Sequence, residues 1–244
     1  MFKNKFVKQV GPTCGIYSLY NGLVYLNGLD KKNVDSNVLN ALNLFSVNSI
    51  PNGYTEIGEY FDIQVYLDFI DNSVINKNVP FSKDFTAKIV DLDIGINSIN
   101  NSGQNCFIIV PTNPKPNFKS NHNAGKNILH WITVYEDKRG VEFINPIKRT
   151  VFPSNKVSKL RTIWDLKNQN NALNGKHFEW NLYIHKKKNI LEHGTKKEIR
   201  AKVNDLWNSK KNRLKSVNNS QLISYQKNLN KCILVEKKQM LITS

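Results

Sequence analysis

The stretch QVGPTCGIYSLYNGL, residues 9–23, contains Cys14, the first of only three cysteines in the chain. Apolar and small residues follow the cysteine at helical spacing and end near Gly28, which predicts a helix that opens at the thiol. Backbone N–H groups at the start of a helix favour a negative charge, so we expect the pKa of this thiol to be lowered. The pattern therefore predicts a reactive cysteine.

The residues beside Cys14 fit an acyl-transfer site. Gly11 and Pro12 shape a tight entry into the helix, and Gly15 leaves space for a substrate backbone to approach the sulfur. Gln9 can turn its side-chain N–H toward the point that the backbone N–H of Cys14 faces, and two such donors form an oxyanion hole. The alternative is a small buried hydrophobic residue at a helix start, which is the commoner situation for a cysteine taken alone.

A thiolate mechanism needs an imidazole, and the imidazole needs an acceptor that orients it. His130 opens an apolar predicted strand, and Asn145 ends the strand that returns after a turn. If the hairpin turns about Asp137 and Lys138, His130 and Asn145 face each other with Cβ atoms about 4.5 to 5.5 Å apart. Asp137 is a poorer partner because it lies roughly 23 Å along the strand. We therefore predict Asn145 as the orienting residue.

The remaining histidines and cysteines are weaker candidates, because each lies in a loop, a basic region or an apolar strand without a partner nearby in sequence. They are His122, His177, His185, His193, Cys106 and Cys232. Three widely spaced cysteines without a Cys-x-x-Cys pair or clustered histidines argue against a disulfide framework and a structural zinc site. We expect no metal and no cofactor, and a reducing compartment in which a thiol can act as a nucleophile.

The elements that must position these residues change in kind along the chain. The first part is mostly helical, with one strand; we predict helices at 14–28, 31–44 (with Asp30 as a cap) and 82–99, and a strand at 63–70. Strands follow at 106–112, 128–136, 140–146 and 178–186. An amphipathic helix over 195–217 places Ile199, Val203, Leu206 and Leu214 on one side. The sequence thus predicts an α+β fold in which helices pack on an antiparallel β-sheet.

The formal net charge of +16 is concentrated near the C-terminus. From Lys186 onward there are 15 Lys and Arg against 4 Asp and Glu, and the earlier residues hold 20 against 15. We therefore expect a catalytic domain at 1–186 and a basic, mainly helical C-terminal extension at 187–244. A polyanion or a protein is the expected partner of this extension, although Lys-rich terminal helices are more often solvated surface.

The chain shows no sign of a membrane anchor or an export signal. No apolar stretch approaches the roughly 18 to 20 residues of a membrane helix, and residues 1–15 lack the apolar core of a signal peptide. We expect no integral membrane segment and a cytoplasmic location. The alternative location is another cell, reached as an effector without a cleavable signal peptide.

The candidate residues occur in an order that resembles the papain-like cysteine peptidase superfamily, closest to the bacterial double-glycine leader peptidase-like group. In order, they are a glutamine, a Cys-Gly pair at a helix start, a histidine before an apolar strand, and an Asn-Pro pair after a hairpin: Gln9, Cys14-Gly15, His130 and Asn145-Pro146. The resemblance covers roughly residues 5–150. It implies that Cys14 is the nucleophile, His130 the general base and acid, Asn145 the orienting residue and Gln9 the oxyanion donor.

The resemblance departs from the leader peptidases at two residues. These enzymes commonly have Asp before the catalytic cysteine and Asp as the third member, where this chain has Thr13 and Asn145. They are also usually fused to a membrane transporter, so the expected relatives are the stand-alone members. The resemblance therefore implies the catalytic machinery rather than a particular substrate.

The expected function is that of a cysteine peptidase that hydrolyses a peptide or isopeptide bond in a protein substrate through a thioester. Gly15 and Trp131 are the expected substrate-binding residues; Trp131 either walls the cleft beside the imidazole or packs in the core. A glutamine deamidase, transglutaminase or acyltransferase with the same triad is the first alternative. A binding module that uses the cationic extension on a polyanion is the second.

Overall fold

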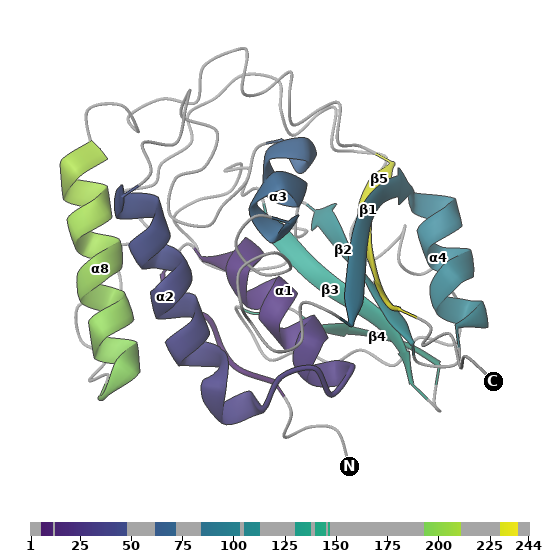
Figure 1. Cartoon of the computed structure of the whole chain (residues 1–244), viewed down its shortest axis with the longest axis horizontal. Helices are drawn as coiled ribbons and strands as arrows, with labels where there is room; N and C mark the ends of the chain where they lie inside the picture. Colours follow the sequence, from purple (N-terminus) through teal and green to yellow (C-terminus); the bar gives the residue numbers. More distant parts are fainter. Residues whose placement is uncertain are drawn as a thin grey trace, which may run out of the picture.

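The computed structural model describes residues 6–11, 13–47, 62–71, 84–102, 105–112, 130–137, 140–144, 146, 193–210 and 230–238. Its elements are, in chain order, α1 (Cys14–Tyr25), the 3-10 helix η1 (Lys31–Asn33), α2 (Val34–Val47), α3 (Ile63–Phe69), β1 (Phe85–Asp91), α4 (Leu92–Asn101), β2 (Cys106–Thr112), β3 (His130–Asp137), β4 (Gly140–Ile144), α8 (Thr195–Lys210) and β5 (Lys231–Lys237) (Figure 1). The described part is therefore a mixed α+β structure.

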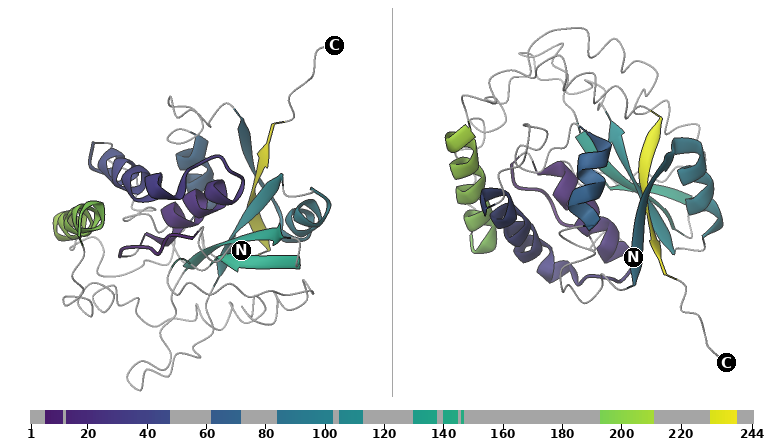
Figure 2. Two further views of the ribbon diagram at one scale, coloured as in Figure 1. Left: turned by 90° about the horizontal axis from the view of Figure 1, so that it is seen from below. Right: turned by 45° about the horizontal axis from the view of Figure 1, so that its top comes forward.

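The five strands form one antiparallel sheet in the order β1-β5-β2-β3-β4. Two buried clusters lie on its two faces, because successive side chains of a strand point to opposite sides. Trp131 and Tyr135 belong to the cluster shared with α1, α2, α3 and α8, whereas Ile132 and Val134 belong to the cluster shared with α4. The views in Figure 2 show α4 on one side of the sheet and the other helices opposite. The expected packing of helices on an antiparallel sheet is confirmed.

Helix α1 forms where the sequence predicts it and is buried along its whole length. A helix that is apolar on most sides belongs in a core, where neighbours cover every face. Gly22 has a specific role in this packing, because a Cβ atom there would overlap the ring of Phe107 on β2. Asp30 caps the next helical segment by accepting the backbone N–H of Lys32, as predicted.

Two predicted elements are wrong. Residues 63–70 were predicted as a strand but form α3, because the Asp62 side chain accepts the backbone N–H of Gln64 at 2.8 Å and so starts a helix. The predicted helix over 82–99 is a helix only from Leu92 onward; residues 85–91 form β1 at the edge of the sheet.

The hairpin between β3 and β4 exists, but its register differs from the expected one. Asp137 pairs with Gly140 and Thr133 pairs with Ile144, which shifts every partner by two residues along β4. Asp and Gly are among the residues that short turns favour, which suits a register that places Asp137 and Gly140 at the ends of the two strands. The expected direct pairing of His130 with Asn145 does not follow from this register, and Asn145 itself lies outside the described residues.

The C-terminal region is not only helical. Residues 231–237 form β5, an interior strand of the sheet that lies between β1 and β2. The reason is visible in the segment KCILVEK, whose four central apolar residues are all buried, as suits a strand covered on both faces. The expected strand at 178–186 and the expected core residue Leu214 lie outside the described residues.

Helix α8 covers residues 195–210 of the predicted 195–217 and packs on α2; the rest of the predicted helix lies outside the described residues. Its residues Ile199, Val203 and Leu206 are buried in the same cluster as α1, which confirms the predicted apolar side as far as the structure describes it. The described parts of the basic extension are thus packed into the same core as α1 and the sheet.

Candidate functional site

Cys14 is the first residue of α1, as predicted. The hydroxyl of Thr13 donates to the carbonyl oxygen of Val10 at 2.7 Å and does not cap the helix. Gly11 has a φ of +68°, a left-handed conformation that glycine adopts without strain. The chain therefore turns sharply into the helix and presents the cysteine in its first turn, where the backbone amides favour negative charge. Pro12 lies outside the described residues.

The sulfur of Cys14 lies in a buried environment that includes a tyrosine. Cys14 and Tyr66 are both 0% exposed, and the Tyr66 hydroxyl donates to the carbonyl oxygen of Gly15 at 2.5 Å. Burial raises the pKa of Tyr66 well above its usual value, and electrostatic interaction with Cys14 raises it further. Tyr66 thus remains a neutral hydrogen-bond donor beside the cysteine. Gly15 is buried as well, so its predicted role in admitting a substrate requires this region to open.

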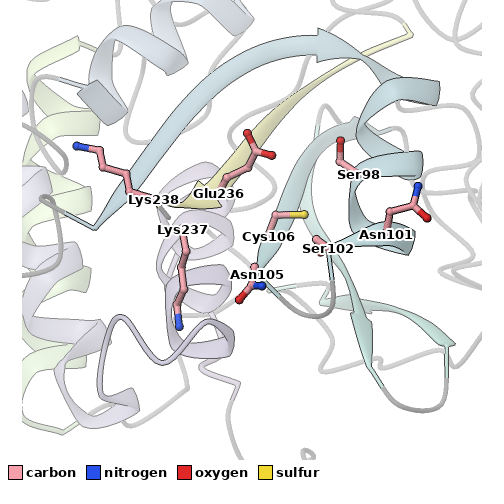
Figure 3. A pocket seen from close by; sticks show the side chains of 8 residues that line it. All are labelled: Ser98, Asn101, Ser102, Asn105, Cys106, Glu236, Lys237 and Lys238. Carbon is pink, nitrogen blue, oxygen red and sulfur yellow. The ribbon is translucent and has the colours of Figure 1, made fainter. Parts of the chain in front are cut away.

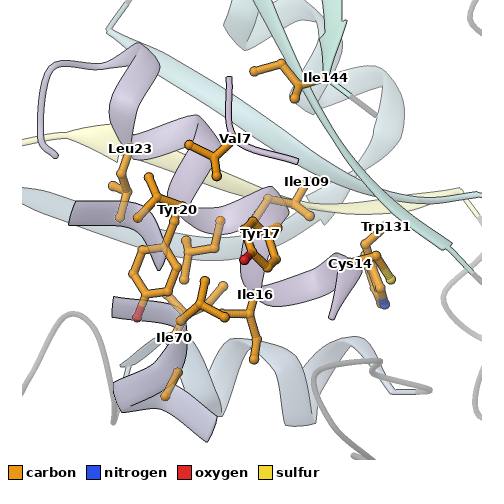
Figure 4. Packing of buried hydrophobic residues seen from close by; sticks show 14 of the residues in the cluster. Val7, Cys14, Ile16, Tyr17, Tyr20, Leu23, Ile70, Ile109, Trp131 and Ile144 are labelled. Carbon is orange, nitrogen blue, oxygen red and sulfur yellow. The ribbon is translucent and has the colours of Figure 1, made fainter. Parts of the chain in front are cut away.

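Trp131 is buried against the same tyrosine. The rings of Tyr66 and Trp131 are 5.0 Å apart at 74°, an edge-to-face contact that aromatic pairs favour. Figure 4 draws Cys14 and Trp131 at the same end of the packed cluster. With an exposure of 1%, Trp131 packs in the core, which is the alternative that the sequence left open for it.

Helix α1 lies on β3 and runs in the same direction. The Ser18 hydroxyl donates to the carbonyl oxygen of Trp131 at 2.9 Å, and the Tyr25 hydroxyl donates to that of Glu136. Cys14 is one helical turn before Ser18, about 6 Å along the axis, and His130 is one residue before Trp131, about 3.3 Å along the strand. The sulfur-bearing residue and the backbone of His130 are therefore at the same end of the α1–β3 pair. The side chain of His130 lies outside the described part.

Gln9 is placed next to the end of the β3–β4 hairpin. Its backbone N–H donates to the carbonyl oxygen of Pro146 at 3.0 Å, so it is adjacent to the residue that follows Asn145. Its side-chain Nε2 donates to the carbonyl oxygen of Gly11 at 2.6 Å, and its Oε1 is buried without a hydrogen-bond partner. An amide nitrogen has two N–H donors, so one remains for a further acceptor such as an oxyanion.

The other two cysteines lie on the opposite face of the sheet. Cys106 and Cys232 belong to the cluster under α4, and none of the three cysteines forms a disulfide. Burial raises the pKa of Cys106, and it raises the pKa of Cys232 to about 12. Both thiols are therefore protonated at neutral pH, which makes them poor nucleophiles.

A pocket of about 470 Å³ opens beside Cys106, between the end of α4 and the ends of β2 and β5 (Figure 3). Ser98, Asn101, Ser102, Asn105 and Lys237 are among its polar lining residues. It contains no residue of the predicted catalytic set, and its cysteine belongs to the cluster opposite that of Cys14.

The described residues contain no group of three His, Cys, Asp or Glu side chains arranged to hold a metal ion. None of their helices combines the length and apolar character needed to cross a membrane.

Tyr66, Ser18 and Thr133 were not predicted from the sequence as site residues, although they lie near the predicted nucleophile or align the helix that carries it. Tyr66 was missed because its segment was predicted as a strand, although Asp62 four residues earlier was a usable signal for a helix start. Ser18 and Thr133 carry no local signal, because their roles arise only when α1 meets β3. Comparison of the chain with protein-family models, curated proteins and solved structures finds no match.

Proposed function

We propose that this protein is a cysteine peptidase with a papain-like fold, which hydrolyses a peptide or isopeptide bond in a protein substrate. Cys14 is the nucleophile, His130 the general base and acid, Asn145 the orienting residue and Gln9 the oxyanion donor. One observation carries the proposal: the hydrogen bonds between α1 and β3 align Cys14 with the start of the strand that His130 opens.

A second contact supports the same arrangement. The bond from the backbone of Gln9 to Pro146 brings the oxyanion donor beside the segment that contains Asn145. The backbone contacts of Ser18 with Trp131 and of Gln9 with Pro146 thus support a triad with an oxyanion hole, which needs groups from separate segments of the chain to meet.

The proposed reaction is an acyl transfer in two steps. His130 accepts the proton of Cys14 and the sulfur attacks the amide carbonyl, while the backbone N–H of Cys14 and the second N–H of Gln9 stabilise the oxyanion. His130 then gives the proton to the leaving amine, which leaves a thioester on Cys14. Water, activated by His130, hydrolyses this thioester and restores the thiol.

The burial of Cys14 sets a condition on this mechanism. Because the residue is 0% exposed, a substrate reaches the sulfur only when the surrounding structure moves. Such opening is common among enzymes that exclude water from a reactive group before the substrate binds. Reaction of Cys14 with a small reagent should therefore be faster than reaction with a bulky one.

Labelling with a thiol-reactive peptide-like probe tests the proposal. We expect the probe to label Cys14 in the wild-type protein, to lose that label in Cys14→Ala and His130→Ala, and to keep it in Cys106→Ala. The last variant is the matched control, because Cys106 is an equally buried thiol outside the proposed site. Unchanged labelling in His130→Ala, or turnover that persists in Cys14→Ala, would refute the proposed pair.

Mass spectrometry of a treated protein mixture then identifies the reaction. New chain termini indicate hydrolysis of a peptide bond, which we expect. A gain of about one mass unit at glutamine would instead indicate deamidation, and attachment of an amine would indicate acyl transfer, both through the same thioester.

A further inference from the structure

Helix α8 contacts the short segment that leads into the proposed nucleophile. The Lys196 ammonium donates to the carbonyl oxygen of Lys8 at 2.9 Å. About two turns further along α8, the methyl groups of Val203 lie against Gly11; a Cβ atom on that glycine would be 3.0 Å from Val203 Cγ1. Two contacts from one helix therefore flank Gln9 on both sides in sequence.

The same lysine connects this segment to α1 through a carboxylate. Lys196 Nζ lies 3.5 Å from Asp35 on α2, and Asp35 accepts a hydrogen bond from the Tyr17 hydroxyl at 2.7 Å. The backbone N–H of Tyr17 bonds to the carbonyl oxygen of Thr13, in the first turn that carries Cys14. The chain of contacts thus runs from α8 through α2 to the start of α1.

These contacts distinguish Lys196 from Lys197, its neighbour on α8. The Lys196 side chain is 35% exposed, whereas the next residue, Lys197, is exposed and its side chain contributes no hydrogen bond or ion pair to this network. A helix that carried only a solvated basic face would not aim one ammonium at a backbone carbonyl beside a buried glutamine. The Lys196 ammonium thus has a backbone and a carboxylate partner close to the buried Gln9.

We propose that α8 is a positioning element for the catalytic centre: Lys196 and Val203 hold residues 8–11 so that the Gln9 amide keeps its place beside Cys14. This inference rests on the proposed peptidase function and assigns a function to the basic C-terminal region within its own chain. Gln9 must hold one N–H on the Gly11 carbonyl and aim the other at the oxyanion, so its backbone has little freedom. Misplacing a catalytic group by about 1 Å is enough to lose roughly 100-fold in rate.

The test compares Lys196→Met with Lys197→Met and Lys196→Arg in the full chain. Hydrogen exchange of residues 8–11 reports directly on how firmly the segment is held. We expect Lys196→Met to speed this exchange by roughly tenfold, Lys197→Met to leave it unchanged, and Lys196→Arg to restore most of the protection because arginine still donates.

Two probes of Cys14 separate positioning from general loosening. A peptide aldehyde forms a hemithioacetal, in which the sulfur adds to the carbonyl carbon and the thiol proton passes to the oxygen held by the oxyanion donors. Iodoacetamide alkylates the thiol without an oxyanion. We expect Lys196→Met to weaken aldehyde binding by roughly tenfold and to change the alkylation rate by less than about twofold.

The outcomes are distinguishable. If Lys196→Met matches Lys197→Met in both exchange and aldehyde binding, the positioning role of α8 is wrong. If exchange rises but the wild-type protein binds no aldehyde, α8 does hold the segment and the peptidase proposal fails instead. Should Lys196→Met not fold, Val203→Ala replaces it, with Leu206→Ala as control; equal exchange at residues 8–11 in these two variants would also overturn the inference.

Discussion

The hydroxyl of Ser18 donates a hydrogen bond to the carbonyl oxygen of Trp131 at 2.9 Å, and this bond fixes how far α1 can slide along β3. A second hydrogen bond joins the same two elements: the hydroxyl of Thr133 donates to the carbonyl oxygen of Ser18 at 2.5 Å. All three residues are buried, so each bond satisfies a group that water cannot reach. The relative position of Cys14 and His130 depends on this alignment.

Replacing Ser18 with alanine should lower the free energy of unfolding by about 1 to 3 kcal/mol, because the carbonyl of Trp131 loses a buried partner. Urea unfolding followed by circular dichroism measures this difference. Ser36→Ala is the matched control: its hydroxyl also bonds to a backbone carbonyl, that of Asn33, but at an exposed site. We expect the control to change stability by less than about 0.5 kcal/mol. Equal losses in the two variants would argue against the aligning role of Ser18.

Tyr66→Phe should destabilise the protein by about 1 to 3 kcal/mol at neutral pH, because the buried carbonyl of Gly15 loses its donor. The raised pKa of Tyr66 adds a pH dependence. Above about pH 10 the unfolded tyrosine ionises while the folded one keeps its proton, so wild-type stability falls as pH rises. Tyr66→Phe should lose part of this fall, which unfolding curves between pH 8 and 11 would detect. An identical slope in both proteins would contradict the buried, neutral hydroxyl.

Removal of β5 should prevent folding. A chain that ends at Asn230 lacks the strand that joins β1 to β2, so it exposes both strand edges and opens the core. A chain that ends at Lys238 keeps β5 and serves as the comparison; we expect it to fold. Circular dichroism and size-exclusion chromatography distinguish the two. A folded chain ending at Asn230 would show that the sheet is stable without the strand between β1 and β2.

Cys232 should make the protein less stable in alkali. Burial raises the pKa of its thiol to about 12, whereas an unfolded cysteine ionises near 8.5. Between these values the unfolded state releases its proton first, so stability is full below about pH 8.5 and is lost as pH rises toward 12, by about 1.4 kcal/mol per pH unit. Cys232→Ala should make the free energy of unfolding fall less steeply with pH than in the wild type, independently of how much the substitution changes stability at neutral pH. Parallel slopes would mean that the thiol ionises alike in both states.

Local patterns predicted much of the fold. The helix that opens at Cys14 and the strands around Ile109 and Val134 have clear periodicity or continuous apolar runs, and all three form as expected. Residues 85–91 were missed because only Phe85 is buried and the other positions are half-buried or exposed, so the segment was predicted as part of the helix that follows it. Residues 231–237 were missed because their apolar run is only four residues long and lies within a lysine-rich region. In both cases the partner strand, which decides the structure, is far away in the sequence.

The candidate site could be predicted by residue type but not by geometry. The position of Cys14 at a helix start follows from the sequence alone. The bond from Gln9 to Pro146, the place of Tyr66 and the two-residue shift of the hairpin register all depend on contacts between remote segments. A shift of that size preserves which face each side chain occupies, so the hydrophobic pattern does not reveal it.

The place of β5 also bears on how the molecule is assembled during translation. The ribosome delivers β1 and β2 long before residues 231–237 emerge, and neither strand has its neighbour on that side until then. Nascent chains with unpaired edges are prone to associate with one another, so this protein should depend on chaperones more than a fold built from consecutive hairpins does. The same delay leaves Cys14 in an incomplete core until most of the polypeptide has been synthesised.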